Sequence, residues 1–138
     1  MKNTMIRPVS ELVLDARKEI TNLLPDKAYE ELVSGAATLI DVREPDELAH
    51  EKIAGAINAP RGMLEFYADP TTPYYKPVFT WGKRIILCCA SSARSALAAQ
   101  TLNRMGYENV AHIDGGIKAW KAADLPLLGV GSANAVRR

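Results

Sequence analysis

Apolar residues recur along the chain with different spacings, and each spacing predicts a different kind of element. In the N-terminal quarter they recur every three to four positions, which predicts helices over 10–24 and 25–35. Two short apolar runs, at 37–42 and 84–89, lack this spacing and predict buried strands. A further short strand is expected within 54–60.

The second half of the chain continues this order of elements. After the strand at 84–89, the pattern predicts a helix over 92–106, a strand over 109–114 and a helix over 115–124. The stretch 70–83 contains prolines and no regular period, so we expect a loop there. Strands that alternate with helices predict an α/β fold, in which a mainly parallel sheet is covered by helices on both faces.

One domain is expected for a chain of 138 residues, because this length closes a single hydrophobic core. Residues 25–127 are predicted to form that domain. Residues 1–24 are predicted to be an N-terminal helical extension that packs on it. The small and polar residues 128–138 are predicted to be a mobile C-terminal tail.

Charge and composition exclude several classes of protein. The formal net charge of +1 gives no broad basic surface for nucleic acid or an anionic membrane. No apolar run approaches the roughly 18 residues that a membrane span needs. Charged residues interrupt the N-terminal segment where a secretory signal would need an apolar stretch. We therefore expect a cytoplasmic protein without nucleic-acid or membrane partners.

The only two cysteines, Cys88 and Cys89, are adjacent, and this limits what they can do. Neighbouring Cα atoms lie about 3.8 Å apart, which is less than the roughly 4.4–6.8 Å usual for a disulfide. Two adjacent cysteines and two distant histidines match no zinc pattern, so no metal is expected. The thiols are therefore either part of the core or chemically reactive.

The segment that follows the strand at 84–89 has the features of an anion-binding loop. Backbone N–H groups between a strand and a helix can point inward, and the helix N-terminus adds partial positive charge. Arg94 adds a permanent cation. A cysteine at the start of such a loop is stabilised as the thiolate, which is the nucleophilic form.

Two registers are compatible with this loop. Counted from Cys88 it reads C-x5-R-S, which is wide enough for a tetrahedral oxyanion such as phosphate; counted from Cys89 it reads C-x4-R-S, which best fits one extra atom on the sulfur. Side chains alternate along a strand, so the two cysteines should face opposite ways. Cys89 stands at the end of the strand and leads into the loop, whereas Cys88 continues the apolar run. We therefore favour Cys89.

Three stretches of the sequence resemble the rhodanese-like sulfurtransferases in order and spacing. They are LIDVREPDEL, IAGAINAP and the long segment from IILCCASSARS to KAADLPL. The resemblance covers residues 26 to 127 and implies a three-layer α/β fold around a mainly parallel sheet. In this family the active cysteine begins a six-residue C-x4-R loop. Matching Arg94 and Ser95 to that motif places the active cysteine at Cys89.

The resemblance implies a thiosulfate sulfurtransferase that needs neither a cofactor nor a metal. Cys89 would take a sulfane sulfur from thiosulfate or a similar small anionic donor and hold it as a persulfide. It would then pass the sulfur to cyanide or a thiol, and a protein could also serve as donor or acceptor. Asp41 and Arg43 would support the site. The residues expected to bind the donor and the persulfide are Arg94, Ala90, Ser91, Ser92, Ala93 and Ser95.

The loop departs from the family pattern in one respect. Many relatives carry a glycine in this loop, and here the positions from Ala90 to Ala93 contain none. If one loop position requires a positive φ, a serine or alanine there is strained by about 1–2 kcal/mol. The hydroxyl groups of Ser91 and Ser92 could offset this strain by hydrogen bonding.

Two other functions remain open. The C-x5-R register from Cys88 is the loop length of cysteine phosphatases and arsenate reductases, although Leu87 stands where such phosphatases usually carry a histidine. The second alternative is a non-enzymatic rhodanese-like module that carries sulfur or binds partners. We expect a structural role for His112 and interpret Gly115 and Gly116 as the start of a helix.

Overall fold

A parallel sheet forms the centre of the fold. The computed structural model describes residues 5–129 and 136–137. In this part of the chain, β1, β6, β5, β2 and β4 lie side by side in that order, each parallel to its neighbours. The bounds are Thr21–Leu23 for β1, Thr38–Asp41 for β2, Ile57–Asn58 for β4, Ile85–Cys88 for β5 and Val110–Ile113 for β6. This arrangement confirms the predicted fold class.

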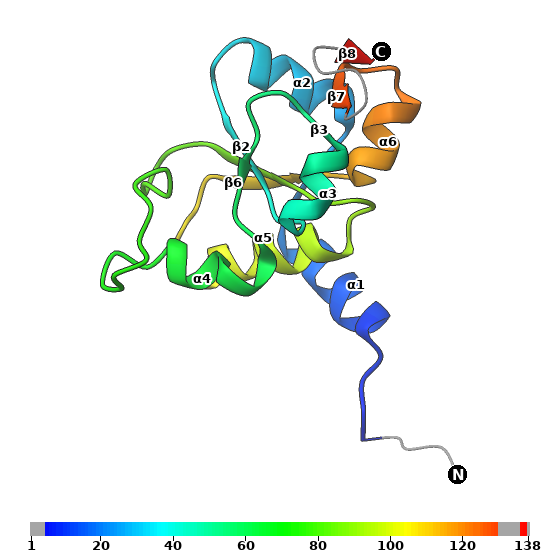
Figure 1. Ribbon diagram of the computed structural model, residues 1–138. Helices are drawn as coiled ribbons and strands as arrows, with labels where there is room; N and C mark the ends of the chain where they lie inside the picture. The colour runs from blue at the N-terminus through cyan, green and yellow to red at the C-terminus, as the bar shows by residue number, and fades with distance from the viewer. Residues whose placement is uncertain (1–4, 130–135, 138) are drawn as a thin grey trace.

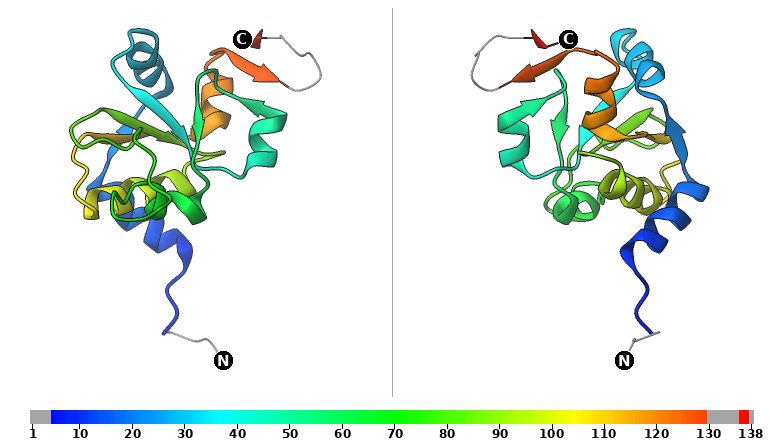
Figure 2. Two further views of the ribbon diagram at one scale, coloured as in Figure 1. Left: turned by 60° about the vertical axis from the view of Figure 1, so that its left-hand side comes forward. Right: turned by 90° about the vertical axis from the view of Figure 1, so that its right-hand side faces the viewer.

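Helices cover both faces of this sheet (Figures 1 and 2). One face carries α2 (Pro25–Val33) and α6 (Gly116–Ala122), and the other carries α1 (Val9–Glu19), α4 (Leu64–Tyr67) and α5 (Ala93–Arg104). Each face has its own apolar core: Trp120 belongs to the core under α2 and α6, and Leu102 to the core under α4 and α5. None of the described helices is long and apolar enough to cross a membrane.

A small antiparallel sheet accompanies the main one. β3 (Glu51–Lys52) pairs with β7 (Leu127–Gly129), which also pairs with β8 (Val136–Arg137). Leu128 and Gly129 of β7, and Val136 and Arg137 of β8, were assigned to a mobile tail by the sequence analysis but belong to hydrogen-bonded strands. Residues 130–135 and 138 of that predicted tail lie outside the described residues. The connections after β2 and β4 contain the short helix α3 (Pro45–His50) and the 3-10 turn η1 (Arg61–Met63).

The predicted helix over 10–24 ends earlier than expected. α1 stops at Glu19, and Thr21–Leu23 form β1 in register with β6. Helical spacing suggested that Ile20 and Leu23 continue the helix, but β6 offers backbone partners at the edge of the sheet that a helix would leave unpaired. The strand that was not predicted brings Asn22 opposite His112.

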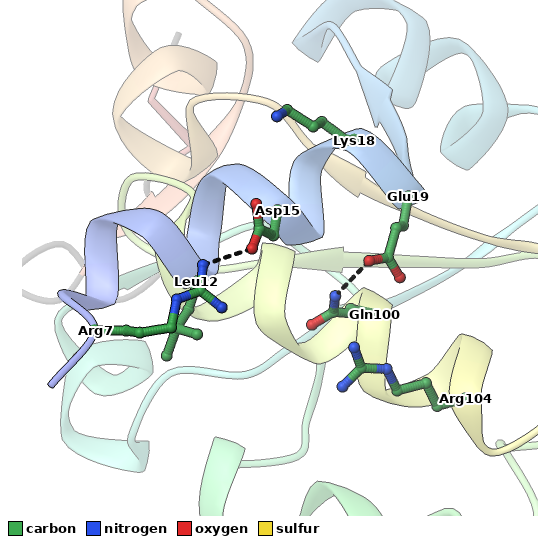
Figure 3. A pocket seen from close by; sticks show the side chains of 7 residues that line it. All are labelled: Arg7, Leu12, Asp15, Lys18, Glu19, Gln100 and Arg104. Atoms are coloured by element: carbon green, nitrogen blue, oxygen red, sulfur yellow. Dashed lines mark hydrogen bonds and ion pairs between the residues drawn. The ribbon is translucent and has the colours of Figure 1, made fainter. Parts of the chain in front are cut away.

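α1 attaches the N-terminal segment to the domain by packing on α5 (Figure 3). Gln100 of α5 donates a hydrogen bond to the Glu19 carboxylate at 3.1 Å, and Ala16 is fully buried. Arg7 and Asp15 form an ion pair at 2.7 Å beside this contact. The N-terminal extension therefore lies on the same face of the sheet as the helix that follows the candidate loop.

The carboxyl ends of the neighbouring strands β2 and β5 lie side by side at the same end of the main sheet. These two strands are neighbours, with Asp41 in register with Cys88. Residues 89–92 follow β5 at this end and lead directly into α5. Ligands of open parallel sheets bind beyond the carboxyl ends of the strands, so the fold places the candidate loop where a site is expected.

Candidate active site

Cys88 and Cys89 belong to opposite faces of the sheet, as the alternation along the strand predicted. Cys88 is fully buried in the apolar core that contains Trp120, under α2 and α6. Cys89 is 1% exposed and belongs to the core that contains Leu102 of α5. Cys89 thus lies on the α5 side of the sheet, where the loop begins.

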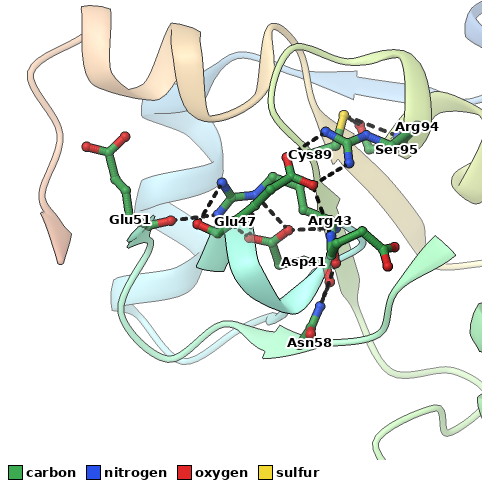
Figure 4. A network of polar contacts seen from close by, with 9 residues as sticks. Asp41, Arg43, Glu47, Glu51, Asn58, Cys89, Arg94 and Ser95 are labelled. Atoms are coloured by element: carbon green, nitrogen blue, oxygen red, sulfur yellow. Dashed lines mark hydrogen bonds and ion pairs between the residues drawn. The ribbon is translucent and has the colours of Figure 1, made fainter. Parts of the chain in front are cut away.

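Ser95, in the first turn of α5, contacts the sulfur of Cys89 from the other end of the loop (Figure 4). The Ser95 backbone N–H donates to Cys89 Sγ at 3.4 Å, and the Cys89 thiol donates to Ser95 Oγ at 3.5 Å. The N-terminus of a helix carries partial positive charge, and its N–H groups stabilise an anion. The sulfur therefore lies where the helix N-terminus and the Ser95 N–H can stabilise negative charge.

The loop between these two residues has backbone donors that are not used. Within the described part of the chain, the N–H groups of Ala90, Ser91, Ser92, Ala93 and Arg94 donate no hydrogen bond. Unpaired N–H groups that precede or begin a helix can bind an anion or an electron-rich sulfur. The structure thus brings the predicted loop residues together at one end of α5 with the donors that this chemistry requires.

Ser92 has a positive φ, a backbone conformation that is costly for any residue other than glycine. Its φ of 153° and ψ of −27° lie outside the regions that L-residues favour, at a cost of about 1–3 kcal/mol. The Ser92 hydroxyl oxygen accepts a hydrogen bond from the Gly115 backbone N–H at 2.6 Å. The Ser92 carbonyl accepts a second bond from Ala96 N–H at 2.8 Å. These bonds hold the strained turn in place and offset part of its cost.

Gly116 brings the start of α6 against the loop, a role that the sequence analysis missed. Its φ is +61°, and a Cβ atom there would lie 2.5 Å from the carbonyl oxygen of Cys89. The close approach lets Ile117 and Lys118 donate backbone hydrogen bonds to the carbonyls of Cys89 and Ala90, at 2.9 and 3.0 Å. In a trans peptide the N–H points opposite to the C=O. Because α6 holds these carbonyls, the next N–H groups are turned away from α6.

Arg94 is held by Glu47 of α3, a residue that the sequence analysis did not identify (Figure 4). Arg94 Nη1 and Nη2 donate to Glu47 Oε2 and Oε1 at 2.8 and 3.0 Å. The hydrogen bond from Arg94 lowers the pKa of Glu47 to about 2. A guanidinium has five N–H donors, so Arg94 keeps donors for a bound anion in addition to those that Glu47 uses.

Asp41 and Arg43 form a buried pair beside this site (Figure 4). Arg43 Nε and Nη2 donate to the Asp41 carboxylate at 3.1 and 2.9 Å, and Nη2 also donates to the Glu51 carbonyl at 2.8 Å. Burial disfavours the charged guanidinium, but the hydrogen bonds and charge of Asp41 raise the pKa of Arg43 above its ordinary value. The pair ties the end of β2 to β3, next to the helix that carries Glu47.

The environment of Cys88 differs from that of Cys89. Burial, followed by the charge of the Asp41 carboxylate, raises the pKa of the Cys88 thiol well above that of an ordinary thiol. Both cysteines are free thiols. The described residues contain no group of three His, Cys, Asp or Glu side chains that could hold a metal ion.

Comparison with known proteins matches the segment that contains this site. Residues 24–123 match the model of the rhodanese-like domain. The chain belongs to the rhodanese-like domain family. The match begins at Leu24, so the family region excludes α1 and β1 and includes the loop, α3 and α6.

Solved and curated relatives have the same fold or a similar sequence. A Rhodopseudomonas palustris protein, described as of unknown function and as a possible tyrosine phosphatase, superposes with a TM-score of 0.85 and 40% identity over 93% of this chain and 99% of that one. The thiosulfate sulfurtransferase GlpE of Vibrio cholerae is 33% identical over 66% of this chain and 78% of its own. A Synechocystis protein is 40% identical over 66% of this chain and 46% of its own. The match thus spans less than half of the Synechocystis relative.

Proposed function

We propose that this rhodanese-like domain is a thiosulfate sulfurtransferase that carries sulfur as a persulfide on Cys89. Its family and the GlpE relative support sulfurtransferase activity. One observation carries the assignment to Cys89: its sulfur lies at the start of the loop of unused N–H groups, with the Ser95 N–H directed at it at 3.4 Å.

The first half-reaction forms the persulfide. The Cys89 thiolate attacks the outer sulfur of thiosulfate, a new S–S bond forms, and the S–S bond of thiosulfate breaks. Sulfite leaves with the bonding electron pair, so no external oxidant or reductant is needed. The persulfide anion then lies at the N-terminus of α5, where the unused N–H groups of the loop stabilise its negative charge.

The second half-reaction returns the enzyme to its starting state. A nucleophilic acceptor, either cyanide or a thiolate, attacks the outer sulfur of the persulfide. The bond between the two sulfurs breaks, and the Cys89 thiolate leaves with the electron pair. The products are thiocyanate or an acceptor persulfide. Neither a metal nor an organic cofactor takes part, and a protein persulfide or a protein thiol could replace the small donor or acceptor in the cytoplasm.

Arg94 and the loop bind the donor in this mechanism. Thiosulfate carries negative charge on its sulfonate oxygens, and charge-assisted hydrogen bonds from a guanidinium are among the strongest that a protein forms. Arg94 is about one third exposed and keeps donors that Glu47 does not use. The N–H groups from Ala90 to Ala93, with Ser95, hold the sulfur, while Asp41 and Arg43 support the position of α3.

A phosphatase is the second candidate, because a similar solved structure is described as a possible tyrosine phosphatase. That chemistry would use Cys88 in the C-x5-R register. The fully buried Cys88 has a raised pKa and faces away from the loop, so its thiolate is disfavoured and does not reach a substrate bound there. We therefore expect no hydrolysis of an aryl phosphate. Hydrolysis that persisted in Cys89→Ser and disappeared in Cys88→Ser would favour the phosphatase.

Steady-state formation of thiocyanate from thiosulfate and cyanide tests the proposed function. We expect turnover in the wild type, loss of turnover in Cys89→Ala, and near wild-type turnover in the matched control Cys88→Ala. Equal loss in a folded Cys88→Ala variant would contradict the assignment to Cys89. Slow turnover with thiosulfate, together with fast transfer from a persulfidated protein, would instead favour a sulfur carrier fed by a protein partner.

A further inference from the structure

A chain of hydrogen bonds leads from the sulfur of Cys89 through the buried residues Ser95 and His112 to the exposed Asn22. The Cys89 thiol lies 3.5 Å from Ser95 Oγ, and Ser95 Oγ lies 2.7 Å from His112 Nδ1. His112 Nε2 lies 2.6 Å from Asn22 Oδ1. Ser95 and His112 are fully buried, so bulk water does not separate these groups. The chain crosses from the loop through β6 to β1.

The direction of these hydrogen bonds is fixed at Asn22. Its side-chain Nδ2 donates to the backbone carbonyls of Arg17 and Ile20, at 3.0 and 3.4 Å, so its Oδ1 must face His112. An amide oxygen only accepts hydrogen bonds, and His112 Nε2 therefore carries a hydrogen. In the neutral imidazole, Nδ1 is then the acceptor, and the Ser95 hydroxyl donates to it.

Ser95 is the hydrogen-bond partner of the Cys89 thiol among the described residues. Cys89 is 1% exposed, and the hydrogen bonds of its sulfur are to Ser95 N and Ser95 Oγ. The Ser95 hydroxyl in turn has two acceptors within reach, the Ser92 carbonyl at 3.1 Å and His112 Nδ1 at 2.7 Å, and the shorter contact is to the imidazole. A backbone carbonyl does not take up a proton at neutral pH, whereas an imidazole nitrogen does.

We propose that His112 accepts the proton of Cys89 through the hydroxyl of Ser95, and that Asn22 holds His112 in the tautomer that this requires. The proposal rests on the function proposed above, in which Cys89 is the nucleophile. Ser95 Oγ accepts the thiol proton while its own proton moves to His112 Nδ1. The products are a thiolate, a neutral serine whose hydroxyl now donates to sulfur, and an imidazolium. The transfer changes no oxidation state, and the reverse transfer restores the thiol.

The electrostatics of His112 suit a transient proton acceptor. Burial, followed by the charge of Arg17, lowers the pKa of His112 to about 4, so the ring is neutral and free to accept in the resting protein. Asp114 opposes this effect and pairs with Arg17 at 3.0 Å. A thiolate at Cys89 adds a negative charge close to the ring, and this charge favours the imidazolium.

The hydrogen bonds from Cys89 to Asn22 also give the N-terminal segment a role in the site. Asn22 lies in β1 and Arg17 in α1, and both precede residue 24, where the family match begins. β1 pairs with β6 in a register that sets Asn22 opposite His112. The N-terminal segment is thus a positioning element for the nucleophile, although it contributes no group to the loop itself.

The pH dependence of Cys89 alkylation tests this proton relay from Cys89 through Ser95 to His112, because alkylation needs the thiolate but no sulfur transfer. The full chain is treated with iodoacetamide from pH 5 to 9, and Cys89 labelling is followed by peptide mass. A thiol that ionises alone reacts about tenfold faster per pH unit below its pKa. A thiolate–imidazolium pair forms without net loss of a proton and adds a pH-independent share to the labelling rate, so the wild-type rate should rise less than tenfold per pH unit between pH 6 and 8.

His112→Asn is the decisive variant, because an asparagine side chain accepts a hydrogen bond but does not take up a proton. We expect its labelling rate, and that of Ser95→Ala, to rise about tenfold per pH unit over the same range. A role limited to packing would shift the whole curve without changing its shape. Parallel slopes in wild type and His112→Asn, both folded by circular dichroism, would overturn the relay. Formation of a Cys89 persulfide under those conditions would leave the proposed function intact, so the two failures are distinguishable.

Discussion

Arg94 and Glu47 form a bidentate ion pair with contacts of 2.8 and 3.0 Å, which holds the Arg94 guanidinium against α3. Forty-seven residues separate the two positions in the sequence. The pair sets where the guanidinium lies and leaves part of it available to an anion. The electrostatic account of donor binding depends on this relationship.

Replacement of Arg94 tests its role in binding the donor. Arg94→Ala should raise the KM for thiosulfate by about tenfold or more, since a charge-assisted hydrogen bond contributes about 1.5–3 kcal/mol, and should change kcat less. Arg94→Lys is the matched control, because it keeps the positive charge and loses the forked pair of donors. Its KM for thiosulfate should lie between those of the wild type and Arg94→Ala. Saturation curves for thiosulfate that coincide in the wild type and Arg94→Ala would remove Arg94 from the donor site.

The buried His112 predicts a loss of stability in weak acid. Its pKa is lowered to about 4 in the folded protein, whereas an unfolded histidine titrates near about 6.5. The unfolded chain therefore binds the proton first as the pH falls below about 6.5, and stability declines until about pH 4. From pH 7 to pH 5 we expect this group to lower the free energy of unfolding by about 2 kcal/mol.

Urea unfolding at pH 7 and pH 5 measures this decline, and His112→Asn should remove the share that belongs to His112. Glu47 does not contribute to the change in stability between pH 7 and pH 5, because its pKa is lowered to about 2. A carboxylate with a lowered pKa stabilises the fold fully above its unfolded value of about 4.3 and loses that effect only below it. The same pH dependence in wild type and variant would show that His112 is not a buried neutral histidine.

Gly116 predicts a change that should disturb the loop specifically. In Gly116→Ala the new Cβ would meet the Cys89 carbonyl at 2.5 Å, and the backbone at φ +61° would also be strained. We expect sulfurtransferase activity to fall sharply in thiocyanate assays. Gly35→Ala is the matched control, since Gly35 has a similar φ of +78° but no atom within 4 Å of an added Cβ.

The control should lose stability by about 1–2 kcal/mol, the usual cost of a left-handed L-residue, and keep its activity. If both variants retained wild-type activity, the contact between α6 and the loop would be unnecessary for catalysis. If both lost activity equally, the effect would come from backbone strain rather than from displacement of Cys89 and Ala90.

Local patterns in the sequence predicted the sheet, the loop and the opposite orientation of the two cysteines. Strand alternation depends on neighbouring residues, so it could separate Cys88 from Cys89 before any contact was known. The same reasoning missed β1. The spacing of Ile20 and Leu23 suits a helix, and only the open edge of β6, far away in the sequence, selects a strand.

The contacts that tune the loop were beyond such patterns because they join distant segments. His112 contacts Ser95 across 17 positions and Asn22 across 90, and nothing in the sequence near His112 marks either partner. Glu47 lies in the first turn of α3, where acidic residues are common, and its contact with Arg94 appears only in the fold. The two glycines at the start of α6 were a visible signal, and the close approach of Gly116 to Cys89 could have been suspected from its position after a strand.

The most direct test of the account is the mass of the reduced protein after incubation with thiosulfate and no acceptor, followed by peptide mapping. The account predicts one added sulfur atom, located on Cys89, and its loss when cyanide is added. Sulfur on Cys88 would contradict the register of the loop. No added sulfur on a folded protein whose Cys89 still reacts with iodoacetamide would contradict thiosulfate as the donor and the central claim.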